Sequence, residues 1–356
     1  MKFIFLESFF GGSHQDFAKG FVENSRHEIE LLTLPPRFWK WRMRGAALYF
    51  LKKIPDLSKF DGLITTDLMS LSDFKGLSGG KCPASAVYFH ENQLTYPLST
   101  EERMDYHFGF TDITTCLAAD RVFFNSKTHF DSFFKQLPPF LRIMPEFKPR
   151  WVIDAIYEKS SVLYPGCRFP AVKEKIDITR KKMPPLIIWN HRWEFDKNPE
   201  DFFLALDQVE KKGFDFRIAV LGERFKRIPK VFDNAKERFK DRIIQFGYIE
   251  SKSQYFDMLK QGSVAVSTAV QENFGISMVE SMRAGCVPLL PDRLSYPEIL
   301  PQRFHEDCLY KDVNDLVKKL CTILSDISGF LEKSTSLCSE MDRYSWDNMI
   351  HEYDYA

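Results

Sequence analysis

The second half of the chain alternates short apolar runs with segments of helical period, and this alternation most constrains the fold. Apolar runs occupy residues 186–189, 216–221, 243–246, 264–267 and 287–290, and helical patterns cover 199–211, 228–239 and 251–260. Short apolar strands separated by helices are typical of parallel strands that are buried on both faces. The pattern therefore predicts a doubly wound parallel sheet.

The first half shows the same alternation less regularly. Apolar runs predict strands at residues 2–6, 28–32, 61–65, 85–89, 121–124 and 161–164, helices are predicted at 14–24, 103–119 and 126–134, and four prolines predict an irregular segment at 138–149. A chain of 356 residues favours two domains of ordinary size. We predict an α/β fold with two Rossmann-like domains facing a central cleft. These are residues 1–168 and 169–343, with a linker near 173–185 and a segment at 344–356 crossing back to the first domain.

Composition narrows the class of protein. Apolar residues make up 44% of the chain, which is enough for two cores, and the formal net charge is zero, so that any basic surface must be local. Seven cysteines occur without a Cys-x-x-Cys pair, which favours reduced thiols over a disulfide framework. No apolar run reaches the length of a membrane span, and the first apolar run is too short for a signal peptide. We expect a cytoplasmic protein.

Two carboxylates, Glu272 and Glu280, stand eight positions apart after the predicted strand at 264–267. The pattern places Glu272 in a loop at the carboxyl end of that strand, and Glu280 in a helix that begins near Gly275. Ligands bind at this edge of α/β sheets, and helix N-termini attract anions. Because carboxylates accept hydrogen bonds from vicinal hydroxyls, the pair suits a sugar and a ribose flanking a diphosphate. The alternative is two solvated residues on a surface helix.

Two cations, Arg192 and Lys197, follow the predicted strand at 186–189 and precede the helix at 199–211. A planar guanidinium and a compact ammonium can together clamp a diphosphate and stabilise the charge on a departing nucleotide. Taken alone, two such residues are usually surface charge. Together with the glutamate pair they indicate one site, because both features lie at strand ends of the same series.

The first half offers weaker candidates. Gly11 and Gly12 lie between the first strand and the first helix, where they can let the backbone approach a ligand or can simply form a tight turn. They do not form the GxGxxG fingerprint of dinucleotide-binding folds. His90 follows the strand at 85–89, where it can bond a hydroxyl or move a proton, although a single histidine is more often structural.

A basic, aromatic segment lies at residues 36–53, which contain six basic residues and no acid. Such a segment can neutralise phosphates and stack on unpaired bases of RNA. It is equally typical of an anionic membrane surface, or of a solvated helix whose tryptophans face inward. The candidate RNA contacts are Arg37, Trp39, Lys40, Trp41, Arg42 and Arg44.

In chain order these elements resemble the GT-B glycosyltransferases, specifically the retaining family 4 type. The resemblance covers essentially the whole chain, and the glutamate pair is its most specific part. It implies that Arg192 and Lys197 hold the donor diphosphate and that Glu280 binds the nucleotide ribose. Glu272, with backbone N–H groups around Asn273, Phe274, Gly275 and Ile276, would position the donor sugar. Gly11 and Gly12 would approach the diphosphate, and His90 would lie near the donor sugar and the acceptor.

The segments at residues 7–14, 89–97 and 189–194 resemble a narrower branch, the tRNA-queuosine α-mannosyltransferases. Most of family 4 has glycine where this chain has His191, and the branch accounts for that departure. The resemblance implies GDP-mannose as the donor, no further cofactor, and the queuosine base of a tRNA anticodon as the acceptor. Two alternatives are a transferase acting on a lipid or polysaccharide, and a non-catalytic RNA-binding module.

The resemblance also implies a front-face reaction in which the leaving phosphate helps to take the acceptor proton. The chain contains no Asp-x-Asp, the usual signature of a metal-bridged diphosphate, and no zinc-type spacing of Cys and His. We therefore expect Arg192 and Lys197 to supply the charge of a divalent ion, and we expect no metal requirement.

Overall fold

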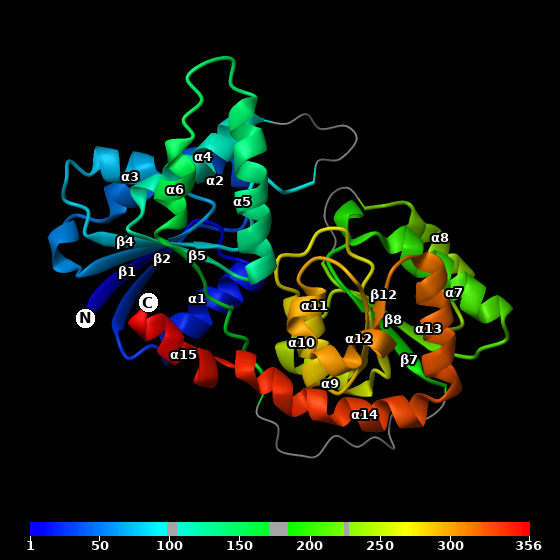
Figure 1. Cartoon of the computed structure of the whole chain (residues 1–356). Coiled ribbons are helices and arrows are strands. Elements are labelled where there is room, and N and C mark those ends of the chain that lie inside the picture. The colour runs from blue at the N-terminus through cyan, green and yellow to red at the C-terminus, as the bar shows by residue number, and fades with distance from the viewer. Residues whose placement is uncertain (98–104, 171–183, 224–227) are drawn as a thin grey trace. The chain divides into compact units, whose positions relative to one another are not determined.

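The computed structural model describes residues 1–97, 105–170, 184–223 and 228–356, which form two compact units (Figure 1). Unit 1 comprises Met1–Arg168 together with Tyr344–Ala356, and unit 2 comprises Phe169–Arg343. Each unit contains one six-stranded parallel sheet. The predicted α/β class with two doubly wound parallel sheets is therefore confirmed, while the cleft between them stays a prediction.

The sheet of unit 1 has the strand order β2-β1-β3-β4-β5-β6. Because β1 lies between β2 and β3, the chain changes its winding direction there, and ligands bind at such switch points. The strands are β1 (Lys2–Glu7), β2 (Glu28–Thr33), β3 (Gly62–Thr66), β4 (Ala84–Phe89), β5 (Arg121–Phe124) and β6 (Ser160–Val162).

Helices cover both faces of this sheet (Figure 1). One face carries α2 (Trp39–Lys53), α3 (Leu71–Leu77), α4 (Tyr106–Ala118), α5 (Lys127–Arg142) and α6 (Trp151–Tyr157). The other face carries α1 (Gly12–Asn24) and the C-terminal helix α15 (Trp346–Tyr355).

Helix α15 is built into the core of unit 1. Trp346 stacks on Phe21 of α1 with ring centroids 6.0 Å apart, and a Cβ at Gly20 would lie 1.8 Å from the indole. Cys167 forms a β-bridge with Ser345. The last residues of the chain thus complete the fold of unit 1.

The sheet of unit 2 has the order β12-β11-β10-β7-β8-β9, so that β7, its first strand, lies between β10 and β8. The strands are β7 (Leu186–Asn190), β8 (Arg217–Leu221), β9 (Ile243–Gly247), β10 (Val264–Val266), β11 (Val287–Pro291) and β12 (Leu309–Tyr310). The longer helices are α7 (Pro199–Lys211), α8 (Val231–Arg238), α9 (Lys252–Gln261), α10 (Ile276–Arg283), α13 (Val313–Ser325) and α14 (Ile327–Glu340), with short α11 (Tyr296–Ile299) and α12 (His305–Cys308).

The structure corrects one prediction, because α5 continues through Pro138 and Pro139 to Arg142, where prolines predicted an irregular segment. Proline lacks a helical donor, but the side chains of Leu137, Phe140 and Leu141 are buried in the core. Their burial outweighs the lost hydrogen bonds, at roughly 1.5–3 kcal/mol for each large apolar side chain. The prediction also missed β12. Most of the predicted linker at 173–185 lies outside the described residues.

All seven cysteines are free thiols. Across the described part of the chain, no helix is long and apolar enough to cross a membrane.

Candidate active site

The carboxyl ends of β7 and β10 bring together Lys197 and Glu272, at the switch point of unit 2. The Lys197 ammonium lies 3.6 Å from the Glu272 carboxylate and donates a hydrogen bond to the Gln271 carbonyl at 2.6 Å. It also lies 3.1 Å from the carboxylate of Asp196, which is fully buried. Lys197 therefore fixes the loop that carries Glu272.

Lys197 is therefore not a solvent-exposed cation that is free to bind a diphosphate. Lys197 is itself only 6% exposed, and it neutralises two carboxylates that would be costly to bury alone. Its direct contact with a diphosphate stays a prediction, while its contact with the glutamate loop is present in the structure.

Arg192 has the opposite setting. Its side chain is 45% exposed, and its guanidinium lies 3.2 Å from the Glu194 carboxylate. The preceding His191 is buried, and this burial, followed by the charges of Lys197 and Arg192, keeps the pKa of His191 well below its usual value. A Cβ at Gly222 would lie 1.8 Å from the His191 carbonyl oxygen, so only glycine lets β8 approach this turn.

Glu280 lies on α10, where it is 5% exposed and each of its carboxylate oxygens accepts a hydrogen bond from a neighbouring side chain. Its two oxygens accept hydrogen bonds from Lys252 at 2.7 Å and from the Tyr255 hydroxyl at 2.6 Å. The same hydroxyl accepts from the Asn190 amide at 2.6 Å, at the end of β7. Burial, with the Glu280 charge, raises the pKa of Tyr255 well above its usual value. A carboxylate with lone pairs left over can also accept from ribose hydroxyls.

Gly275 shapes the start of α10. It caps the helix with φ 98°, a left-handed conformation that favours glycine, and no side chain caps the first turn. The Ser295 hydroxyl donates to the Phe274 carbonyl at 2.7 Å, which holds the turn between Glu272 and Ile276. The helix N-terminus is therefore placed beside the glutamate loop, as an anion site requires.

In unit 1, buried ionisable groups gather where β1, β3 and β4 end. Glu7 is the last residue of β1, Asp67 follows β3 and His90 follows β4. The Glu7 carboxylate lies 3.5 Å from Nδ1 of His14 and accepts a hydrogen bond from the Phe9 backbone amide at 2.8 Å. The Asp67 carboxylate accepts a hydrogen bond from the His90 backbone amide at 2.9 Å. The ring centroids of His14 and His90 lie 4.1 Å apart.

The charges of this cluster have opposite effects on its two imidazoles. Burial opposes protonation of His14, but the Glu7 charge and hydrogen bond raise its pKa to about 9. Burial, with the charges of His14 and His129, keeps the pKa of His90 well below its usual value. Burial raises the pKa of Asp67 to about 7. At neutral pH His14 is thus a cation paired with Glu7, and His90 is neutral.

Glu7, His14 and His90 also form the metal-capable group of the described chain, because their possible ligand atoms all lie within 4.8 Å of one another. A carboxylate and two imidazoles are ligands that zinc accepts. The ion pair between Glu7 and His14 accounts for the same geometry without an ion.

The two glycines of unit 1 have different explanations. A Cβ at Gly11 would lie 2.5 Å from the Pro36 side chain, so packing alone requires glycine there. Gly12 has φ 51°, and a Cβ there would meet no atom within 4 Å. At Gly12 it is thus the backbone conformation and not packing that favours glycine, and its approach to a ligand stays a prediction.

The basic, aromatic segment covers the whole of α2 and the residues just before it. Trp39 packs against Phe108, whereas the Trp41 side chain is 77% exposed and Phe38 is 66% exposed with φ 58°. Trp39 thus packs against the core, as the solvated-helix interpretation predicts, whereas Trp41 faces solvent.

Sequence reasoning missed several residues that contact the predicted site residues within each unit. These are Glu7, His14, Asp67, Asn190, Asp196, Lys252 and Tyr255. Position was the available signal for three of them, because Glu7, Asp67 and Asn190 stand at or just after strand ends. His14, Lys252 and Tyr255 lie on helices whose sequences give no such signal.

Comparison with known proteins identifies the family. The family described as tRNA-queuosine alpha-mannosyltransferase N-terminal matches residues 2–167, and that described as glycosyl transferases group 1 matches residues 172–334. A tRNA-queuosine alpha-mannosyltransferase of Drosophila melanogaster is 37% identical over 98% of this chain and 94% of its own. A GDP-mannose:cellobiosyl-diphosphopolyprenol alpha-mannosyltransferase of Xanthomonas oryzae pv. oryzae is 23% identical over 46% of this chain and 43% of its own.

Solved structures share the fold at low identity. Sucrose-phosphate synthase from Thermosynechococcus elongatus superposes with a TM-score of 0.76 at 13% identity, covering 100% of this chain and 98% of that one. Anabaena HepE in complex with UDP gives a TM-score of 0.70 at 13% identity, covering 100% and 99%. Fold, family matches and near full-length identity agree, and the chain belongs to the tRNA-queuosine alpha-mannosyltransferase family.

Proposed function

We propose that this protein transfers mannose from GDP-mannose to the queuosine base of a tRNA, with retention of configuration and without a metal ion. The Drosophila relative, at 37% identity over 98% of this chain, is the observation that carries the choice of donor sugar and acceptor. The contact between Lys197 and Glu272 at a switch point supports the transfer itself.

The donor occupies the carboxyl edge of unit 2 in this proposal. Its diphosphate lies at the N-terminus of α10 and is held by the exposed Arg192, which exchanges Glu194 for phosphate oxygens. Its ribose hydroxyls are bound by Glu280, whose orientation Tyr255 and Lys252 already fix. Glu272 accepts hydrogen bonds from mannose hydroxyls while Lys197 holds its loop.

The chemical step exchanges one bond for another at the anomeric carbon. The bond from that carbon to the diphosphate oxygen breaks, and an acceptor hydroxyl oxygen bonds to the carbon on the same face. The acceptor proton passes to the leaving diphosphate oxygen. Arg192 and the α10 N-terminus stabilise the charge that builds on the diphosphate, which is the role a divalent ion would have.

His90 is placed in this proposal beside the sugar and the acceptor. Because its pKa is held well below the usual value, it is neutral at physiological pH and can accept or donate a hydrogen bond to a hydroxyl. Burial is the main cause of the low pKa of His90, and the paired cation of His14 adds to it, so that His14 is a positioning residue.

The acceptor tRNA contacts the start of α2 in this proposal. Arg37, Lys40, Arg42 and Arg44 would meet phosphates, and the exposed Trp41 would stack on a base. Seven free thiols support a reducing compartment, so that we propose the cytoplasm.

The test is incubation of the purified protein with GDP-mannose and with queuosine-containing or queuosine-free tRNA, followed by mass spectrometry of the digested RNA. A gain of one hexose on queuosine, with the α configuration, is expected only with the first tRNA. Transfer to a lipid-linked sugar instead would show the acceptor to be of another class.

A further inference from the structure

A second basic, aromatic surface occurs at the junction of α5 and α6, in a segment that sequence reasoning left as irregular. Residues 142–151 contain three basic residues, Arg142, Lys148 and Arg150, and one acid, Glu146. The chain has a formal net charge of zero, so this positive excess is local. We call Arg142, Phe147, Lys148, Arg150 and Trp151 the α5–α6 surface.

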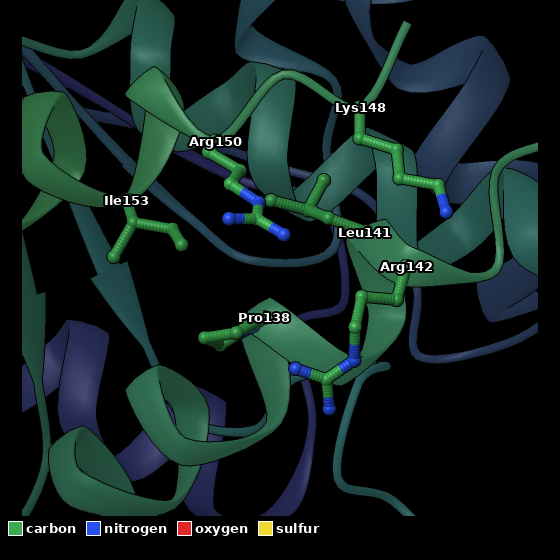
Figure 2. Close-up of a pocket in the computed structure, with 6 residues that line it drawn as sticks. All are labelled: Pro138, Leu141, Arg142, Lys148, Arg150 and Ile153. Carbon is green, nitrogen blue, oxygen red and sulfur yellow. The ribbon is translucent and has the colours of Figure 1, made fainter. Parts of the chain in front are cut away.

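The three basic side chains surround a cavity of about 280 Å³ (Figure 2). Its other lining residues are Pro138, Leu141 and Ile153, so that the walls are apolar and every charge around them is positive. Among the described residues, none of the three basic side chains has an ion pair or a hydrogen bond, in contrast to Lys197 and Arg238. Their charge is therefore available to an outside anion.

Two aromatic rings extend from the same segment into solvent. Phe147 is 85% exposed and Trp151 is 64% exposed, which is unusual for rings of this size. Phe147 also has φ 51°, a left-handed conformation that costs a non-glycine residue about 1–3 kcal/mol. The loop thus holds an apolar ring in water at an energetic cost that packing does not recover. Unpaired nucleic-acid bases stack on rings presented in this way.

The position of the surface selects the kind of anion. Helix α5 begins just after β5, at the carboxyl edge of the sheet, and its 16 residues span roughly 24 Å, at ~1.5 Å per residue, before the surface is reached. The start of α2 lies at the carboxyl edge. Helix α4 packs against both α2 and α6, so the two basic segments lie in the same helical layer. A nucleotide sugar is too short to contact both the carboxyl edge and the α5–α6 surface at once, whereas a folded RNA is long enough to do so.

We propose that the α5–α6 surface binds the phosphodiester backbone of the acceptor RNA at a distance from the reacting base, with Phe147 and Trp151 stacking on unpaired bases. This inference rests on the proposed function, because it takes the acceptor to be a tRNA. Arg142, Lys148 and Arg150 give the RNA a second point of contact, which fixes the direction in which it crosses unit 1.

The test compares the variant Arg142→Gln/Arg150→Gln with wild type in steady-state mannose transfer to queuosine-containing tRNA. We expect the KM for tRNA to rise roughly tenfold, with kcat and the KM for GDP-mannose unchanged. The salt dependence of tRNA binding, measured by filter binding, should become shallower by about 0.7–0.9 per lost phosphate contact. Phe147→Ala should raise the KM for tRNA by about fivefold or more.

The matched control is Arg121→Gln/Lys135→Gln, which removes two exposed basic residues of unit 1 that do not line the cavity. It should leave the KM for tRNA within about twofold of wild type, since a diffuse charge effect is small at physiological salt. An equal rise in the KM for tRNA in control and test variants would overturn the proposal.

The two levels of the proposal fail differently. If wild type transfers no mannose to queuosine-containing tRNA, the proposed function fails. If wild type is active and the Arg142→Gln/Arg150→Gln variant keeps its KM and salt dependence for tRNA, the α5–α6 surface is not an RNA contact. Loss of binding to vesicles containing phosphatidylserine, with tRNA binding intact, would assign the surface to a membrane and likewise overturn the proposal.

Discussion

The two sheets place chemically different groups at their carboxyl edges. In unit 2 the edge carries Arg192, whose side chain is 45% exposed, and Glu272, whose carboxylate lies 3.6 Å from the ammonium of the buried Lys197. In unit 1 the edge carries Glu7 and His14, which form a buried ion pair. His90 lies beside this pair, and burial together with the His14 charge keeps its pKa low. One edge thus presents charges to a ligand, and the other uses its charges to set the state of a neighbouring side chain.

This difference shows how one fold serves two tasks. In the proposed function the edge of unit 2 binds a diphosphate, which needs accessible donors and a helix N-terminus such as Arg192 and α10. In unit 1, burial and the charge of His14 keep the pKa of His90 low, and the Asp67 carboxylate accepts a hydrogen bond from the His90 backbone amide. The predictions below test each edge in turn.

Substitution of Glu272 should have the largest effect. Glu272→Ala and Glu272→Gln should lower kcat for mannose transfer by about 10²–10³-fold or more, because in the proposed function this carboxylate positions the donor sugar. The melting temperature should change little, because a strand-end loop carries little core packing. The exposed Glu250 on the same unit, changed to Gln, serves as the control. Transfer at a wild-type rate by either Glu272 variant would remove the residue from the site.

Substitution of Arg192 should weaken donor binding. Arg192→Ala should raise the Kd for GDP by roughly 10–100-fold, as expected for loss of a charge-assisted hydrogen bond worth about 1.5–3 kcal/mol. Arg192→Lys should recover only part of this, because an ammonium does not present a planar fork. Isothermal calorimetry provides the measurement, and an unchanged Kd for GDP in the Ala variant would contradict the diphosphate clamp.

The edge of unit 1 should make stability depend on pH. His14 has a folded pKa of about 9, above its usual 6.5, so its stabilisation is complete below pH 6.5 and is lost as the pH rises through 9. The pKa of Asp67 is raised from 3.8 to about 7. Its effect on stability has the same sign, because the free energy of unfolding falls as the pH rises from 3.8 to 7. Each proton changes the unfolding free energy by at most ~1.4 kcal/mol per pH unit.

Urea unfolding of wild type and His14→Asn between pH 6 and pH 10 measures the contribution of His14. The wild-type free energy of unfolding should fall more steeply with pH than that of the variant, because only wild type releases this proton. Parallel curves would show that His14 is not a buried cation.

Removal of metal ions should have the smallest effect. Dialysis against EDTA should change the rate of mannose transfer by less than about twofold, because in the proposed function Arg192 and the α10 N-terminus supply the positive charge. A rate that falls with EDTA and returns with one divalent ion would reverse this expectation. Glu7, His14 and His90 would then be the first ligands to test by substitution.

The two edges also differ in how far the sequence predicts them. Arg192, Lys197 and Glu272 are recognisable because they lie in loops that follow predicted strands, and Glu280 because it lies in the helix after such a loop; the structure brings Lys197 and Glu272 within 3.6 Å. Glu7 stands at the end of β1, but nothing in the sequence shows that it pairs with His14, which lies on helix α1. Likewise, the packing of Leu137, Phe140 and Leu141 decided that α5 continues through two prolines.

The sequence by itself determined most strands and their alternation with helices, though not β12 or the full length of α5, and hence two doubly wound sheets, because periodicity of apolar residues is a local property of the chain. It also determined which polar residues stand at strand ends. Only the tertiary structure decided that Lys197 is buried against Asp196 and Glu272, and that Trp41 and Phe147 face solvent while Trp39 packs inward. The physical reason is that burial and charge pairing depend on residues far apart in the chain, which come together only when strand order is fixed.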